Sequence, residues 1–183
     1  ATLAPPVREL ISRLSLTAAA FTRDQAIAIA GLPPPVAEPG LVLDGLIGPW
    51  LEVVIEGLYR VSPLLKGMGT DVNGPAWTID NHRKIGRTLA RQRVLTPTDA
   101  SSILMHATFA RDWGIIGQLS YGLMRADTET WAALAQSLSW FTIVAIGDGA
   151  GYLDAEPFTR FLIRLLQFRV AAAEGDDERA LQI

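Results

Sequence analysis

The sequence predicts a mainly α-helical protein with a single β-hairpin in its first third. Apolar residues recur at helical spacing along most of the 183-residue chain, and residues 50–61 combine β-branched and aromatic residues in two short runs. Prolines, glycines and helix-capping residues separate these segments. We therefore expect three helices, the hairpin, and then a series of antiparallel helical hairpins.

Composition limits the function classes. The chain is 49% hydrophobic, has a net charge of −3 and contains no cysteine. A hydrophobic fraction of this size supports a packed core, whereas nucleic-acid binders usually show a basic excess that is missing here. Without cysteine there is no disulfide, thiol nucleophile or Cys-ligated metal. No apolar run approaches the roughly 20 residues of a membrane span, and no secretory signal opens the chain. We expect a cytoplasmic protein without a membrane segment.

Two amphipathic helices open the chain. The first is expected over about 5–16, and its buried stripe consists of Val7, Leu10, Ile11 and Leu14. The second has Thr22 as its N-cap, with Gln25 completing a capping box. Gly31 supplies its C-terminal stop.

A short apolar helix then precedes the hairpin. It starts near Val36 or Pro39 and runs to about Ile47, where Gly48-Pro49 ends it. Residues 50–55, WLEVVI, form the first strand, Glu56-Gly57 the turn, and residues 58–61 the second strand. Three helices followed by a hairpin is the order of elements in a winged helix.

This region also resembles a known family. The runs VRELISRLSL, AFTRDQAIAIAG and LVLDGLIGPWLEVVIEGLYRVSPLLKG, and above all VSPLL at 61–65, are similar to the winged-helix module that follows the nucleotide-binding core of STAND-type (NB-ARC-like) signalling NTPases. The resemblance covers about residues 7–66 and implies a regulatory module beside an NTPase core. That core is not in this sequence, which contains no G-x-x-x-x-G-K-[ST] motif.

The predicted domain organisation has three parts. The winged-helix-like module covers 5–66, a Gly-rich linker covers 67–75, and a helical-repeat region covers 76–183. Neither end has the pattern of a natural terminus, so we expect a fragment of a longer protein, truncated at its C-terminus.

The helical region divides into segments with clear starts. The first covers 76–92, and later ones begin at Thr96-Pro97, with Asp99 at N3, at Asp112, at Asp127 or Thr128, and near Pro157. Expected core positions are Ile79, Ile85, Leu89, Ala100, Ile103, Leu104, Ala107, Trp113, Ile116, Leu119, Leu123, Trp131, Leu134, Ala135, Leu138, Phe158, Phe161, Leu162, Leu165 and Phe168. Residues 113–117, WGIIG, resemble the opening of a tetratricopeptide repeat, although no 34-residue period follows. We predict a TPR-like α-solenoid with degenerate repeats.

Two motifs that could carry chemistry are weak. Residues 141–154 contain Gly147, Gly149 and Gly151, but their G-x-G-x-G spacing is not that of a dinucleotide loop, and a Gly-rich loop between repeats is the simpler interpretation. His82 and His106, the two histidines, have no metal-ligand spacing or triad partner in sequence. We therefore predict no catalytic residue, no cofactor and no metal.

Arg83, Lys84, Arg87 and Arg91 form the best candidate contact site. Residues 83, 87 and 91 would share one helix face, which could meet a partner protein, another domain of the parent chain or phosphates, or could simply be solvated. The helix at 36–47, which would read DNA in a winged helix, has no basic residue and carries Glu38 and Asp44. Three tryptophans at 113, 131 and 140 could be core residues or could hold a peptide.

The leading hypothesis is a non-catalytic regulatory and protein-interaction fragment of a larger signalling ATPase. In this hypothesis the winged helix packs on the NTPase core, and the concave side of the helical repeats binds a protein partner. The alternative is a winged-helix DNA-binding transcription regulator. A remote third possibility is a small-ligand enzyme that uses the 147–151 loop.

Overall fold

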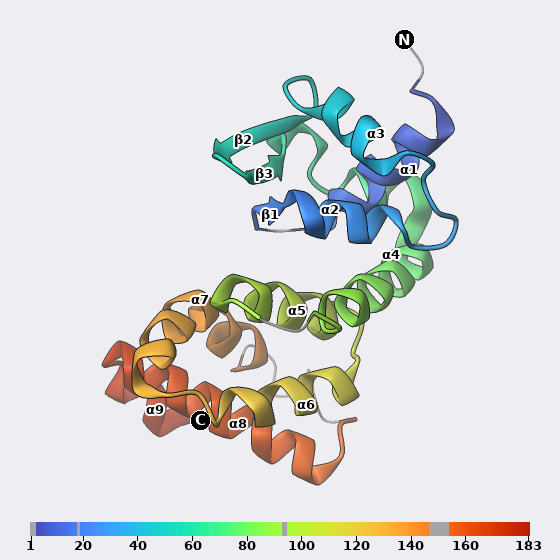
Figure 1. The fold of residues 1–183 in the computed structure, drawn as a ribbon. Coiled ribbons are helices and arrows are strands. Elements are labelled where there is room, and N and C mark those ends of the chain that lie inside the picture. Colours follow the sequence, from blue (N-terminus) through green and yellow to red (C-terminus); the bar gives the residue numbers. More distant parts are fainter. Residues whose placement is uncertain (1–2, 18, 93–94, 147–153) are drawn as a thin grey trace. The chain divides into compact units, whose positions relative to one another are not determined.

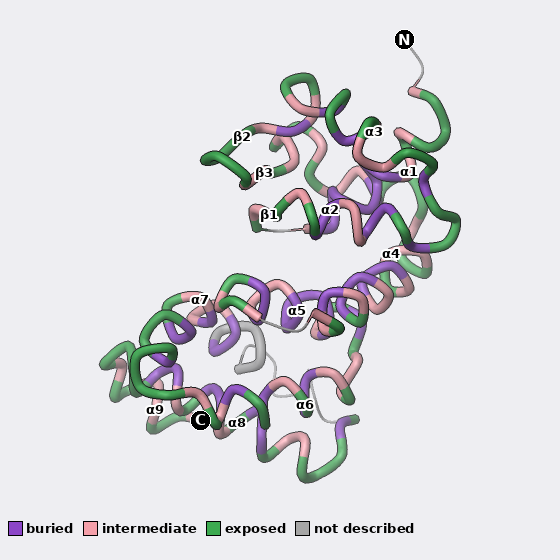
Figure 2. The backbone as a smooth tube through the Cα atoms, viewed as in Figure 1, coloured by how far each residue is buried: buried purple, intermediate pink, exposed green. Residues whose placement is uncertain are grey.

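The computed structural model describes residues 3–17, 19–92, 95–146 and 154–183 (Figure 1). These residues are mainly helical, with a small antiparallel sheet of three strands. They fall into two compact units, Ala1–Leu89 and Ala90–Ile183, and each unit has its own buried residues (Figure 2). The predicted mainly α-helical class is confirmed at this level.

The first unit contains α1, β1, α2, α3, β2, β3, η1 and α4. Their bounds are Pro5–Leu14, Phe21–Thr22, Arg23–Ala30, Pro39–Leu46, Leu51–Ile55, Leu58–Val61, Pro63–Leu65 (a 3₁₀ turn) and Met68–Leu89. The stripe of α1 is buried at Leu10, Ile11 and Leu14. The capping box of α2 is confirmed, because the Gln25 N–H donates to Thr22 Oγ1 at 3.2 Å and the Thr22 N–H donates to Gln25 Oε1 at 2.9 Å.

The sheet has the order β1-β3-β2. The predicted hairpin is confirmed as β2 and β3, which pair Leu51 with Val61. The short strand β1 was not predicted from the sequence; it pairs Phe21 with Tyr59 on the other side of β3. Two residues give little sequence signal for a strand, and here the strand exists because β3 offers it a free edge.

The predicted linker at 67–75 requires a correction. Residues 68–73 are helical, and α4 continues past Gly74, whose φ of 80° interrupts its geometry before Pro75. Gly69 is buried against α1, where its N–H donates to Ser15 Oγ at 2.9 Å. The division between units follows Leu89 instead. Glycine at position 69 allows α4 to pack closely on α1, and the linker prediction from the glycine content of this segment is therefore wrong.

A buried arginine fixes the end of α2 in this unit. The Arg13 guanidinium donates to the carbonyl oxygens of Leu32 at 2.7 Å, Pro34 at 3.0 Å and Ile29 at 3.3 Å, and it pairs with Glu9 at 2.7 Å. Its side chain is fully buried. Arg13 therefore supplies donors to the carbonyl groups of Leu32 and Pro34 in the Pro-rich loop. It adds a second donor to the carbonyl of Ile29, which also accepts from the Leu32 N–H.

The described residues of the second unit form helices joined by short turns, with no strand among them. It contains α5 (Pro97–Phe109), α6 (Trp113–Leu123), α7 (Thr128–Ile146), α8 (Pro157–Glu174) and α9 (Asp177–Gln182). The predicted cap of α5 is confirmed, since Thr96 and Asp99 form a capping box. Helix α5 packs on α6 and α7, α8 packs on both α6 and α7, and α9 packs on α8.

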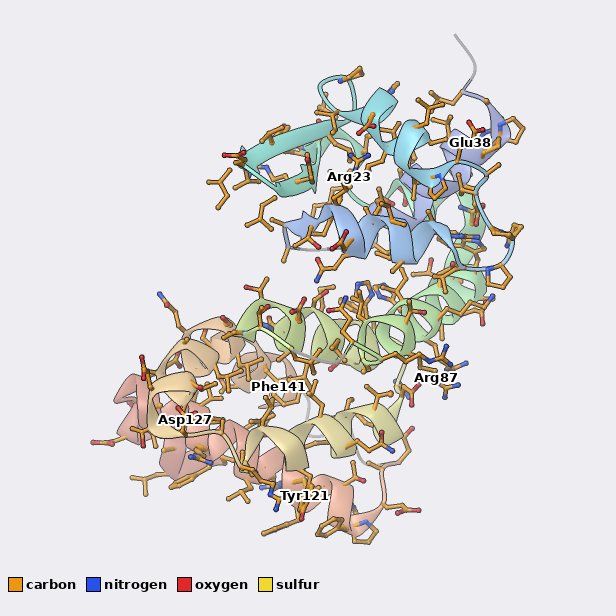
Figure 3. The ribbon with its side chains drawn as sticks, in the orientation of Figure 1. Arg23, Glu38, Arg87, Tyr121, Asp127 and Phe141 are labelled. Carbon is orange, nitrogen blue, oxygen red and sulfur yellow. The ribbon has the colours of Figure 1, made fainter. Side chains whose placement is uncertain are left out.

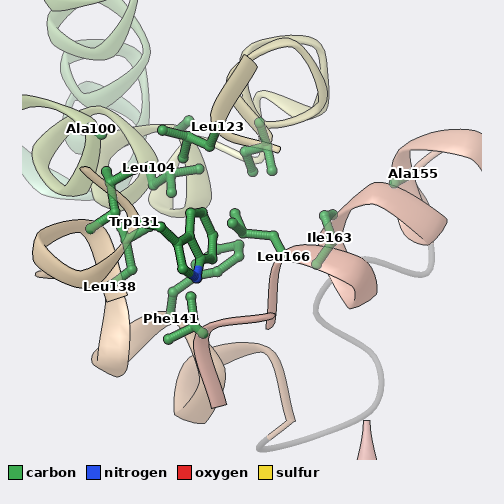
Figure 4. Close-up of a cluster of buried hydrophobic side chains, with 13 residues drawn as sticks. Ala100, Leu104, Leu123, Trp131, Leu138, Phe141, Ala155, Ile163 and Leu166 are labelled. Carbon is green, nitrogen blue, oxygen red and sulfur yellow. The ribbon is translucent and has the colours of Figure 1, made fainter. Parts of the chain in front are cut away.

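The core of this unit lies among α5, α6, α7 and α8 (Figure 4). Trp131 is 7% exposed, and the Arg169 guanidinium lies 4.2 Å from the centre of its ring, a cation–π contact. The indole N–H of Trp140 donates to Ser101 Oγ at 2.8 Å. Tryptophans 131 and 140 are therefore structural, and the peptide-holding interpretation of these two has no support in the packing.

Candidate interaction surface

The most prominent surface feature of the second unit is an apolar face of α8 that no other described residue covers. Phe158, Phe161 and Phe168 are 63%, 57% and 48% exposed. They were predicted to be core residues, and this prediction is wrong. The buried face of α8 consists of Leu162, Ile163, Leu166, Gln167, Val170 and Ala171.

The exposed residues form one continuous stripe. Phe158, Phe161, Leu165 and Phe168 are spaced i, i+3, i+7 and i+10, so they follow one side of the helix. We call these four residues the α8 stripe. The spacing is that of the a and d positions in a coiled-coil heptad, the pattern with which a helix contacts a single partner helix. Helix α8 thus has two apolar faces, and only one of them packs against the rest of its unit.

A groove between α6 and α8 extends the stripe. It has a volume of about 270 Å³ and is lined by Gly114, Gly117, Gln118, Tyr121, Phe158, Thr159 and Leu162. Tyr121 is 53% exposed on α6 (Figure 3). Sites for small ligands usually measure about 300–1,000 Å³, so this groove suits a single large side chain better than a metabolite.

Two glycines shape that groove in different ways. A Cβ on Gly117 would lie 3.1 Å from Thr159 Oγ1, so this glycine allows α6 and α8 to approach closely. A Cβ on Gly114 would meet only the Asp112 carboxylate, at 3.7 Å, so position 114 is open. The sequence singled out this region only as a possible repeat motif.

The exposed aromatic area is large for a surface patch. Taking about 200 Å² for each aromatic side chain, the exposed fractions of Phe158, Phe161, Phe168 and Tyr121 amount to roughly 400 Å². The largest apolar patch on a monomeric protein is typically about 300–600 Å² and is often functional. The stripe and groove are therefore the strongest candidate binding surface among the described residues of this unit.

Positive charge borders the stripe on one side. Arg160 and Arg164 follow one side of it, and α8 has no acidic residue between Pro157 and Ala173. Arg160 forms no side-chain hydrogen bond or ion pair with any described residue, whereas Arg164 donates to the carbonyl oxygen of Ile183. Arg125, two residues after the end of α6, lies 5.8 Å from the centre of the Tyr121 ring. This local charge contrasts with the chain's net charge of −3.

The structure divides the predicted basic cluster. Arg83, Lys84 and Arg87 lie on the last turns of α4, and Lys84 is paired with Asp80 at 2.6 Å. Helix α4 ends at Leu89, so Arg91 lies beyond it in a turn and does not continue the helical face. The predicted shared face of residues 83, 87 and 91 is therefore shortened to Arg83 and Arg87.

Neither histidine belongs to a site. His82 is buried on α4, and burial lowers its pKa to about 4. His106 is fully buried on α5, in the other unit. Over residues 3–17, 19–92, 95–146 and 154–183, no group of three His, Asp or Glu side chains could hold a metal ion. The glycines at 147, 149 and 151 lie outside the described residues.

Helix α3 and the hairpin present acidic and apolar surfaces. The Arg23 guanidinium binds both carboxylate oxygens of Asp44, one of them at 3.0 Å, and this hydrogen bonding lowers the pKa of Asp44. At the hairpin, Val53, Val54 and Ile55 are 56%, 46% and 60% exposed. Leu41 on α3 is 68% exposed. The first unit thus carries exposed apolar side chains on α3 and β2.

A small pocket in the first unit is lined by Ser15, Thr17, Ala19, Arg60, Val61, Pro63 and Lys66, with a volume of about 200 Å³. Arg60 and Lys66 bring two positive charges to this pocket, and Glu52 offsets one of them by pairing with Arg60 at 2.7 Å. Its lining mixes these two cations with the apolar side chains of Ala19, Val61 and Pro63.

Comparison of the chain with protein-family models, with curated proteins and with solved structures finds no match. None of the helices that the structure describes combines the length and hydropathy needed to cross a bilayer. The interpretation of this protein's function therefore depends on its own geometry.

Proposed function

We propose that this chain is a non-catalytic regulatory and protein-interaction segment of a larger signalling ATPase. The observation that carries the proposal is the connectivity of the first unit. Its order α1-β1-α2-α3-β2-β3, with β1 paired to β3, matches the element order expected of a winged helix. The VSPLL segment begins at Val61, the last residue of β3, and leads out of the hairpin as the resemblance to the STAND NTPases implies.

The second unit supports the interaction part of the proposal. Helix α5 contacts α6 and α7, and α8 contacts α6 and α7, so the consecutive pairs α5–α6 and α7–α8 pack against each other. Stacked hairpins of this kind are the repeating unit of α-solenoids such as TPR arrays, which bind proteins or peptides on extended surfaces. In this proposal the array binds a protein partner.

The exposed residues of the winged-helix-like module favour a protein neighbour over DNA. Val53, Val54 and Ile55 place apolar side chains on β2, where a DNA-binding wing would present cations to phosphates. Helix α3 has no basic residue, and Asp44 engages Arg23. The alternative, a DNA-binding transcription regulator, is therefore the weaker proposal. In the leading proposal, the signalling-ATPase segment, the apolar wing packs on the NTPase core.

The coding sequence of the parent gene provides the first test. We expect a G-x-x-x-x-G-K-[ST] motif in the same reading frame, upstream of this chain, and its absence would refute the proposal. In the parent protein, Val54→Glu on the wing should change the ATP hydrolysis rate, because a buried charge would weaken the wing's packing. Asp24→Asn on the exposed side of α2 is the matched control and should leave the rate unchanged.

A further inference from the structure

We infer that the α8 stripe, together with the groove between α6 and α8, binds one amphipathic helix whose apolar side is flanked by acidic residues. This inference rests on the proposed function, since it specifies the kind of partner that the helical array takes. It departs from the concave binding face expected from sequence and assigns binding to the outward side of α8.

The spacing of the stripe specifies a helix as the occupant. Phe158, Phe161, Leu165 and Phe168 repeat at alternating three- and four-residue steps, which match the a/d positions of a partner helix over three turns. A strand has a side-chain period of two residues and would meet only some of these side chains. The groove beside Phe158 accepts one large apolar side chain of that helix.

Charge specifies the flanks of the partner. With Phe158 and Leu165 at a positions, the exposed Arg164 occupies a g position, which borders the stripe. Arg160, which is half-buried and has no side-chain partner among the described residues, lies one turn before it at the outer c position. Opposite charges beside an apolar seam determine which helices pair. Glutamate or aspartate next to the partner's apolar residues would pair with the Arg164 guanidinium, and the Arg160 charge one turn away would add to the attraction.

The same charges disfavour a second copy of this chain. With Phe158 and Leu165 at a positions, Arg164 occupies a g position and Arg169 an e position. Antiparallel pairing of two stripes about their centre would place Arg164 opposite the same residue of the copy, and parallel pairing would place it near Arg169 of the copy. Both arrangements juxtapose like charges, which is unfavourable.

The experiment measures binding of a designed peptide to the 183-residue chain by fluorescence anisotropy. The probe is a labelled helical peptide of about 21 residues, three heptads, with Leu at a and d and Glu at e and g. Two matched peptides replace the Glu residues with Lys, or the Leu residues with Ser. We expect the Glu peptide to bind at least about tenfold more tightly than either.

Variants of the chain locate the site. Phe161→Ser removes the centre of the stripe, and Gly114→Leu fills the groove from an open position. Each substitution should weaken binding of the Glu peptide to the chain by about tenfold or more. Arg160→Glu combined with Arg164→Glu should invert the preference toward the Lys peptide. Phe109→Ser, which replaces an aromatic residue that is 61% exposed on α5, is the control and should bind as the unmodified chain does. Circular dichroism and thermal melting verify that each variant folds.

Equal binding of the Glu and Lys peptides, or binding that the α8 variants leave unchanged, would overturn the inference. So would self-association in sedimentation velocity that Phe161→Ser abolishes, because the occupant would then be a second copy. The upstream NTPase motif and the Val54→Glu variant would still test the proposed function after any of these results. Conversely, absence of that motif would refute the ATPase proposal and would not alter peptide binding at α8.

Discussion

Gly69→Ala should destabilise the first unit, although alanine favours helices more than glycine does. A Cβ at position 69 would lie 2.2 Å from the Ser12 carbonyl oxygen and 2.9 Å from Ser15 Oγ. Both distances are shorter than van der Waals contact allows. The shorter one is to a backbone carbonyl oxygen, which cannot move away by a side-chain rotation. The start of α4 would therefore have to move from α1 and would lose the hydrogen bond from Gly69 N to Ser15 Oγ.

The magnitude follows from three terms. Overpacking of a tight contact costs about 1–3 kcal/mol, a lost buried hydrogen bond costs about 1 kcal/mol, and replacing helical glycine by alanine returns up to about 1 kcal/mol. We expect a net loss of about 2 kcal/mol in the free energy of unfolding, measured by urea denaturation with circular dichroism.

Gly45→Ala is the matched control in the same unit. A Cβ at position 45, inside α3, meets nothing within 4 Å, so this variant should be stabilised by about 0.5–1 kcal/mol from helix propensity alone. Equal effects of the two substitutions would refute the packing of α4 on α1 and would restore segment 67–75 as a linker.

Two further predictions concern buried polar groups. Arg13→Met should cost about 3–5 kcal/mol in the free energy of unfolding, because it removes the donors to three carbonyl groups and leaves Glu9 unpaired, and it should speed hydrogen exchange of the α2 amides. Arg8→Met, exposed on the same helix, should change the free energy by less than about 0.5 kcal/mol, and a similar loss in both variants would contradict the role of Arg13. The pKa of His82 is lowered from 6.5 to about 4 in the folded chain. As the pH drops from 6.5 toward 4, His82 is protonated in the unfolded chain before it is protonated in the folded chain, so the free energy of unfolding should fall over this interval. Comparison with His82→Gln isolates this effect, because the variant should lose less stability over that interval, and parallel pH profiles would show that His82 is not buried in the neutral form.

Local signals in the sequence predicted the helices and the hairpin well. Capping residues such as Thr22, Thr96 and Asp127 act within one turn, so the start of a helix can be read from a few neighbouring residues. The Gly-Pro break at 48–49 ends α3 for the same local reason.

What the sequence did not specify is which of two apolar faces a helix buries. Helix α8 carries Leu162, Ile163 and Leu166 on one side and the α8 stripe on the other, and both sides follow helical spacing. Aromatic size favoured the stripe as core, while the packing of α6 and α7 on α8 selected the aliphatic side. Gly69 shows the same limit, because the role of a glycine depends on the atoms that approach it from distant parts of the chain.

The final prediction separates the two proposed functions of the first unit. A winged helix that reads DNA needs cations on its third helix and wing, since phosphate contacts supply most of the affinity. Here α3 has none, Arg60 on β3 of the hairpin is paired with Glu52 on β2, and Arg23 is paired with Asp44. We expect the chain to bind a 20-base-pair duplex no more tightly than about 100 µM at physiological salt, the weak end of non-specific binding.

A positive comparison makes that result informative. Val53→Lys combined with Ile55→Lys places two cations on exposed positions of β2 without removing a buried residue, and should increase DNA affinity in a salt-dependent way if the unit has winged-helix geometry. Micromolar binding by the unmodified chain, lost on Arg23→Glu, would favour the DNA-binding regulator. The expected pattern, weak binding that only the added lysines strengthen, would mean that the unit keeps the shape of a DNA reader while its own charges direct the wing toward protein.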